Sequence, residues 1–162
     1  MDGSMEQLPF PLKAMVGGRI TYIARVLYEY AGEIDPDDGA IELGINDQVL
    51  LLDATADGDR LRVREGAWKD PFSEPLSEDN RRHIESHGKW RWVDCSHLNA
   101  YAELIGQPIT SIAALMNEHG HLAGVRISVS SRSLWFVVHG DECRVYWAQP
   151  IGFKERNAIF SS

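Results

Sequence analysis

The fold of this chain is decided by residues 41–52, IELGINDQVLLL. Every second residue from 41 to 45 is aliphatic, and this period of two is typical of a strand with one buried and one solvated face. Asn46-Asp47 supplies residues that favour a tight turn. The continuous apolar run 49–52 fits a strand that is covered on both faces. The stretch therefore predicts a β-hairpin.

The segments on both sides of this hairpin extend it into a sheet. Residues 57–59, Asp-Gly-Asp, predict a second turn, and the strand that follows begins at Leu61. Upstream, the β-branched and aromatic residues of 20–30 favour a strand over a helix. We therefore expect a four-stranded antiparallel meander.

The same order of elements occurs a second time. Residues 20–24, ITYIA, recur as residues 109–113, ITSIA, at an offset of 89 that Gly17 and Gly106 also keep. An alternating segment at 125–129, an apolar run at 134–138 and a Gly-Asp turn at 140–141 then follow in the order of the first copy. The sequence thus predicts an internal repeat of two similar β units.

The connection between the two copies has a different composition. Ser77 and the acidic residues after it predict a helix that ends at Gly88, and a second helix is expected from Ser96 to Leu104. Between these helices, Trp90 to Val93 alternate like a short strand. We expect an α+β fold in one compact domain: two similar antiparallel β-meander units, residues 12–69 and 105–149, joined by a helical linker, residues 70–104. Periodicity leaves open whether the units form one sheet or two.

Charge is distributed unevenly along the chain. The net charge is −8, with −10 in residues 1–80 and +2 in residues 81–162, and residues 26–59 hold ten acidic residues without Lys or Arg. A field of one sign attracts basic partners and repels phosphate backbones, so we expect no nucleic-acid binding. The alternative is that this acidic face only aids solubility.

The remaining global features indicate a cytoplasmic protein without a membrane span. No apolar run approaches the roughly 20 residues of a membrane helix, and the N-terminal residues lack the pattern of a signal peptide. Two cysteines are too few for a disulfide scaffold.

No catalytic motif of a common enzyme class is present, and we predict neither a catalytic residue nor a cofactor or metal site. The segment Asp35-Pro36-Asp37-Asp38-Gly39 departs from the spacing of an EF-hand and predicts a turn instead. One alternative is a small metal-dependent enzyme, because five residues with ligand chemistry lie within fifteen positions. They are His83, His87, Asp94, Cys95 and His97.

Two groups of residues are the predicted partner-binding site of a non-catalytic protein. Acidic side chains without a nearby base would attract a basic partner, and tryptophans next to charged residues are typical of interface hot spots. The predicted residues are Asp35, Asp37, Asp38, Glu42, Trp90, Arg91 and Trp92. A third reading is a structural β domain that associates with itself through exposed strand edges.

The pattern Gly-x-x-Ile-Thr-x-Ile, followed by a polar turn, an alternating strand and a Gly-Asp hairpin, resembles small bacterial β-rich domains encoded beside polymorphic and type VI toxin genes. The resemblance covers residues 20–63 and 109–145. It implies an immunity protein: a cytoplasmic, non-catalytic inhibitor that occludes the active site of a toxin. The acidic first half of the chain favours a toxin with a basic domain. The shared motifs are structural, so the resemblance assigns no binding residue.

Overall fold

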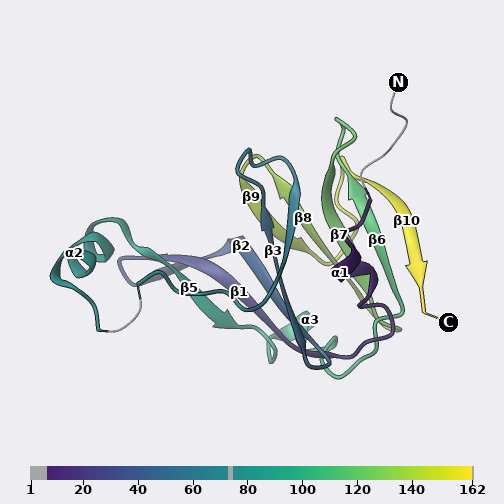
Figure 1. Ribbon diagram of the computed structural model, residues 1–162, viewed down its shortest axis with the longest axis horizontal. Coiled ribbons are helices and arrows are strands. Elements are labelled where there is room, and N and C mark those ends of the chain that lie inside the picture. The colour runs from purple at the N-terminus through teal and green to yellow at the C-terminus, as the bar shows by residue number, and fades with distance from the viewer. Residues whose placement is uncertain (1–6, 73–74, 162) are drawn as a thin grey trace.

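The first of two antiparallel sheets contains the hairpin at 41–52. Its strands are β1 (Ile20–Tyr30), β2 (Glu33–Ile45), β3 (Gln48–Ala54), β4 (Leu61–Glu65) and β5 (Lys89–Asp94). The computed structural model describes residues 7–72 and 75–161. The spatial order is β4-β3-β2-β1-β5 (Figure 1). Ile41 pairs with Leu52 and Ile45 with Gln48, and Asn46 turns the chain with a φ of 54°, a left-handed value that asparagine tolerates. The predicted hairpin is confirmed.

The second sheet follows the same plan. Its strands are β6 (Ser111–Met116), β7 (Leu122–Ser128), β8 (Ser133–His139), β9 (Glu142–Tyr146) and β10 (Lys154–Phe160), in the order β10-β6-β7-β8-β9. In each sheet four consecutive strands form a meander, and a fifth strand returns to pair with the first. Each sheet is therefore one strand larger than the predicted meander, and β10 lies outside the predicted unit boundaries. The two units form two sheets and not one.

Helices contribute little to this architecture. They are α1 (Phe10–Lys13), α2 (Glu78–His87) and α3 (Asn99–Ala102), so the fold is mostly β and the α+β expectation gave the helices too much weight. The prediction for α2 is confirmed: Ser77 Oγ accepts a hydrogen bond from Asn80 N–H, and Gly88 follows the helix with a φ of 78°. None of the helices in the described ranges is long and apolar enough to cross a membrane.

The predicted helix from Ser96 to Leu104 is wrong in its extent, because only residues 99–102 are helical. Ser96 does not cap this helix. Its Oγ instead accepts a hydrogen bond from the N–H of Ile23 on β1 (3.0 Å). The short strand expected within the predicted linker, residues 70–104, is β5, and it belongs to the first sheet.

The turn predicted at residues 35–39 is a local one within a strand, where Asp35 Oδ1 accepts a hydrogen bond from Asp37 N–H (2.9 Å), as in an Asx turn. These residues lie inside the long strand β2, where Gly39 pairs with Leu27 and Ile34 pairs with Glu29. Residues 35–38 therefore stand opposite the single residue Tyr28, which makes this a β-bulge. The bulge carries Asp35, Asp37 and Asp38, outside the part of β2 that pairs with β3.

One hydrophobic core joins the two sheets. Ile23, Ile41 and Leu52 of the first sheet and Ile112 and Phe136 of the second are fully buried and belong to the same cluster. The two predicted copies also meet at equivalent backbone positions. Gly17 N–H donates to Ile109 O (2.8 Å), and Gly106 N–H donates to Ile20 O (2.7 Å), so the 89-residue offset maps one bond onto the other.

Arg25 of β1 makes a second connection between the two sheets, and its side chain is buried, with only 3% of the residue exposed. Its guanidinium donates to the carbonyl oxygens of residues 39 and 40 on β2 (2.9 and 3.2 Å) and of Cys143 on β9 (3.3 Å). It also donates to the Tyr101 hydroxyl (3.2 Å). Asp38 accepts a hydrogen bond from Cys143 N–H (2.7 Å). Arg25 thus binds the backbone carbonyl group of Cys143, and Asp38 binds its backbone N–H, at the outer strand of the second sheet.

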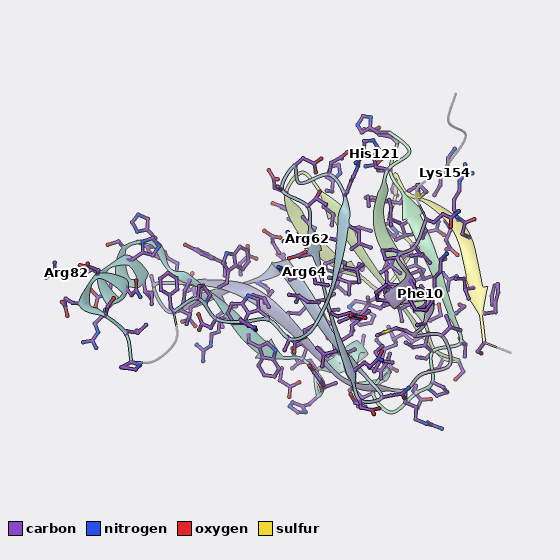
Figure 2. The ribbon with its side chains drawn as sticks, viewed as in Figure 1. Phe10, Arg62, Arg64, Arg82, His121 and Lys154 are labelled. Atoms are coloured by element: carbon purple, nitrogen blue, oxygen red, sulfur yellow. The ribbon has the colours of Figure 1, made fainter. Side chains whose placement is uncertain are left out.

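A third joint lies where turns of the two sheets meet, at the end of the body where Figure 2 labels His121. Asp59, in the turn before β4, accepts hydrogen bonds from His121 Nδ1 (2.7 Å) and Asn117 Nδ2 (3.2 Å) in the turn between β6 and β7. The hydrogen bond from His121 is the main cause that lowers the pKa of Asp59.

The first sheet extends beyond the core as an arm. In Figure 1, β5 and the adjoining parts of β1 and β2 project from the two-sheet body, and α2 lies at the far end. Arg82 of α2 marks that end in Figure 2. No residue of α2 is buried. The arm therefore exposes residues that would be covered if the two sheets overlapped along their whole length.

Candidate functional site

A groove with a volume of about 680 Å³ lies along β5, and we call it the β5 groove. It is lined by side chains of β1, β2 and β5 and by the segment 67–70. Besides Ala67, these are two indoles, three carboxylates and two basic groups: Trp68, Trp92, Glu29, Glu42, Asp70, Lys89 and Arg91. The segment 67–70 reaches the groove because β4 and β5 lie at opposite edges of the sheet, so the chain between them has to cross a sheet face.

Glu42 lies in this groove and is only 2% exposed. Its neighbours Ile41 and Leu43 face the core, so the alternation along β2 turns Glu42 to the opposite face. Its carboxylate accepts three hydrogen bonds, from Tyr22 Oη (2.7 Å), Trp92 Nε1 (3.1 Å) and Trp68 N–H (2.7 Å). Burial, followed by the hydrogen bond to Glu42, raises the pKa of Tyr22 far above its ordinary value. Tyr22 therefore remains a donor at neutral pH.

The tryptophans of β5 are partly exposed on the same face. Trp90 is 43% and Trp92 41% exposed. Trp92 contacts Tyr22 at a ring-centroid distance of 6.4 Å, and Trp90 contacts Tyr28 edge-on at 5.3 Å. These contacts hold both indoles in place while leaving part of each ring accessible. Rigid, half-exposed aromatic rings are the material of binding hot spots.

The two basic side chains of the β5 groove are already paired. Lys89 Nζ lies 2.6 Å from Asp70 Oδ2, and Arg91 Nη1 lies 2.6 Å from Glu29 Oε2. Burial by itself would raise the pKa of Asp70, but its hydrogen bonds to Lys89 and to the N–H of Phe72 outweigh that effect and lower it. Both ion pairs tie β5 to its neighbouring segments.

The predicted binding residues lie in three different locations. Glu42, Arg91 and Trp92 come together in the β5 groove. Trp90 and Asp38 line a smaller cavity of about 230 Å³, to which Trp68 also contributes. Asp35 and Asp37 lie outside both cavities, exposed on the bulge of β2.

Two predicted acidic residues have internal partners. Glu42 was expected at the surface, but it is buried under Trp92 and Tyr22. Asp38 is half-buried and bound to the backbone of Cys143. Of the four predicted acids, only Asp35 and Asp37 are exposed.

Sequence reasoning missed Tyr22 and Asp70 as site residues. The alternation of β1 places Tyr22 on one face of its strand, yet it does not show which residue of the neighbouring strand stands beside it. Asp70 lies in a loop whose path over the sheet follows from the strand order. Trp68 was noticeable only as a tryptophan among charged residues.

The residues of the metal-enzyme alternative do not form one site. His83 and His87 stack on each other in α2 at 4.7 Å, and His83 also stacks on Phe72. Asp94 is the last residue of β5 and His97 follows the strand, so both lie roughly 17 Å or more from Lys89 at the rise of an extended strand. Within the described ranges, no three His, Cys, Asp or Glu side chains are arranged to hold a metal ion.

The cysteines are not arranged as nucleophiles. Burial raises the pKa of Cys95, and it raises that of Cys143 to about 12. Because the thiolate is the reactive form, neither thiol is activated at neutral pH.

Comparisons with known proteins do not assign this site. The chain matches no protein-family model, and searches of curated proteins and of solved structures find no significant match. The function proposed below therefore rests on the geometry of the β5 groove and the surfaces around it.

Proposed function

We propose that this protein is a non-catalytic protein-binding module, and most specifically an immunity protein that neutralises a cognate bacterial toxin in the cytoplasm. The observation that carries the proposal is the pair of partly exposed indoles, Trp90 and Trp92, fixed on the projecting strand β5 beside the β5 groove. Half-exposed aromatic anchors next to charged side chains suit a protein partner better than a small polar substrate.

The charge of the first half supports a basic partner. Asp35 and Asp37 are exposed on the bulge of β2. They belong to residues 26–59, which include ten acidic residues and no Lys or Arg. Complementary charge raises the rate of encounter, while buried aromatic side chains slow dissociation. Acidic steering residues and aromatic anchors therefore have separate kinetic roles in this proposal.

The first test uses the gene that neighbours the one encoding this protein. Its product, co-expressed with this chain, should co-purify with it, and this chain should restore growth to cells that the product poisons. If the two proteins do not associate and the cells are not rescued, the immunity function is wrong.

The kinetic test separates charge from anchoring. Asp37→Lys should slow association and weaken its salt dependence, whereas Glu118→Lys, the same charge change on the exposed turn between β6 and β7, should change association much less. Trp92→Ala should speed dissociation by about tenfold for each 1.4 kcal/mol lost. Tyr146→Ala on β9 is its control. If Trp92→Ala and Tyr146→Ala dissociate at the same rate, the partner docks elsewhere.

A second candidate function is self-association through a strand edge. β10 is the outer strand of the second sheet, and its Phe160 is 70% exposed. An exposed edge strand with an apolar side chain can pair with a second copy of the chain. Light scattering distinguishes the two functions, because a monomer at all concentrations contradicts self-association.

A further inference from the structure

The donors that the described residues supply to the carboxylate of Glu42 are neutral groups. All three groups that donate to its carboxylate are neutral: a phenol, an indole N–H and a backbone N–H. In the described part of the chain, no Lys or Arg forms an ion pair with it. Buried charges in proteins are usually paired with an opposite charge. An unpaired carboxylate below an open groove leaves a negative potential for a ligand to neutralise.

The basic groups of the β5 groove do not supply the missing charge, since Asp70 holds Lys89 and Glu29 holds Arg91. The lining therefore contains three carboxylates against two cations, and the excess carboxylate is Glu42.

The walls of the groove have the chemistry that attracts organic cations. The indoles of Trp68 and Trp92 both line it, and Trp92 exposes 41% of its surface. The face of an aromatic ring attracts a cation within about 6 Å of its centre, and tryptophan does so most strongly. Within the described ranges, the contact between a cation and an aromatic ring joins Arg132 to Trp147, outside the β5 groove. It therefore involves neither Trp68 nor Trp92.

We propose that the β5 groove receives a lysine or arginine side chain of the partner protein, with its cation stacked on Trp68 and Trp92 above the carboxylate of Glu42. This inference rests on the proposed function, since it takes the ligand to be part of a protein. A volume of about 680 Å³ accommodates a basic side chain with its aliphatic stem. The charge of −10 in residues 1–80 favours such a partner at long range.

The test compares two probes of the same shape. Nα-acetyl-arginine amide carries the guanidinium, and Nα-acetyl-citrulline amide replaces it by a neutral urea. Each is titrated into ¹⁵N-labelled protein at constant ionic strength while the indole N–H signals of the five tryptophans are followed by NMR. We expect a dissociation constant of about 1 mM for the arginine probe, about tenfold weaker binding of the citrulline probe, and shifts in the Trp92 indole signal.

Variants locate the binding site. Trp92→Leu should weaken arginine binding about tenfold. Trp90→Leu, two residues away on the same strand, should leave it within about twofold, because Trp90 does not line the groove. Glu42→Gln should abolish the preference for arginine over citrulline. That variant also rearranges three hydrogen bonds, but the comparison of the two probes on the unchanged protein does not depend on its folding.

Each outcome decides the inference. Equal affinity for both probes, or an arginine effect that Trp90→Leu and Trp92→Leu reduce equally, overturns it. If the partner co-purifies while the groove shows no preference for arginine, the inference fails and the proposed function stands. If the groove prefers arginine but no partner is found, the groove is a cation site and the immunity function fails.

Discussion

Replacing Arg25 by methionine tests how the two sheets are held together. The variant keeps an unbranched apolar stem in the buried position but loses the guanidinium. Three backbone carbonyl groups, those of Gly39, Ala40 and Cys143, then lack the donor that they have in the native structure. A buried polar group without its partner costs about 1–3 kcal/mol.

The expected loss follows from that count. Three carbonyl groups at the lower end of the range give a loss of about 3 kcal/mol in the free energy of unfolding. We take the lower end for two reasons. Methionine relieves the desolvation of a buried cation, and a cavity of about 280 Å³ beside Arg25 can admit water to some of the carbonyl groups. For a chain of this length, the melting temperature should fall by roughly 6–12 °C.

Urea denaturation followed by tryptophan fluorescence measures the loss. Arg82→Met is the control, because Arg82 of α2, labelled in Figure 2, pairs with Glu78 at the surface at a distance of 3.4 Å, and such an exposed pair contributes about 0.3–0.5 kcal/mol. Tyr101→Phe should lose about 1 kcal/mol, since it removes one hydrogen bond of Arg25. If Arg25→Met is no less stable than Arg82→Met, the guanidinium does not join the sheets and the reasoning is refuted.

Three further predictions concern the other joints and the thiols. Asp38→Ala should lower the free energy of unfolding by about 1–3 kcal/mol because it leaves Cys143 N–H without an acceptor, while Asp38→Asn, which keeps an acceptor, should lose less in the same assay. Cys95 and Cys143 should react with Ellman's reagent at pH 8 only in urea, because burial raises the pKa of both thiols; rapid reaction of the native protein would contradict this. The lowered pKa of Asp59 means that its ionised form stabilises the fold at neutral pH, and that this contribution is lost as the pH falls below about 4 through the lowered value. Urea midpoints between pH 7 and pH 2 should therefore fall less steeply at the acid end for Asp59→Asn than for the native chain, and identical slopes would rule out the contribution of the contact with His121.

The local pattern of the sequence predicts the strands well because each strand carries its own signal. Alternation in 41–45, the turn at Asn46-Asp47 and the apolar run after it act over a few residues, and the structure confirms them. The strand around Trp90 was also predicted, but its pairing with β1 was not. Whether a strand pairs with β1 or remains in a linker depends on contacts between residues 60 to 70 positions apart. No local period carries that information.

At the candidate site, too, residue types follow from the sequence, whereas contacts between distant residues do not. The sequence was sufficient to identify Trp90 and Trp92 as aromatic residues among charges, and the acidic excess of the first half follows from composition. The sequence did not distinguish the acids that face solvent from those with internal partners. Glu42 and Asp35 carry the same carboxyl group, yet Glu42 is buried below Trp92 and Tyr22 and Asp35 is exposed.

By itself, the sequence determined the β-rich character, the order of strands within each meander and the uneven charge, because period-two hydrophobicity, turn chemistry and composition are properties of neighbouring residues. Only the tertiary structure decided that there are two sheets, that Arg25 and Asp38 join them, and that Glu42 lies at the base of the β5 groove. Burial and hydrogen bonding depend on which distant segments come together. The packing of the whole chain therefore decides which polar side chains remain available to a partner.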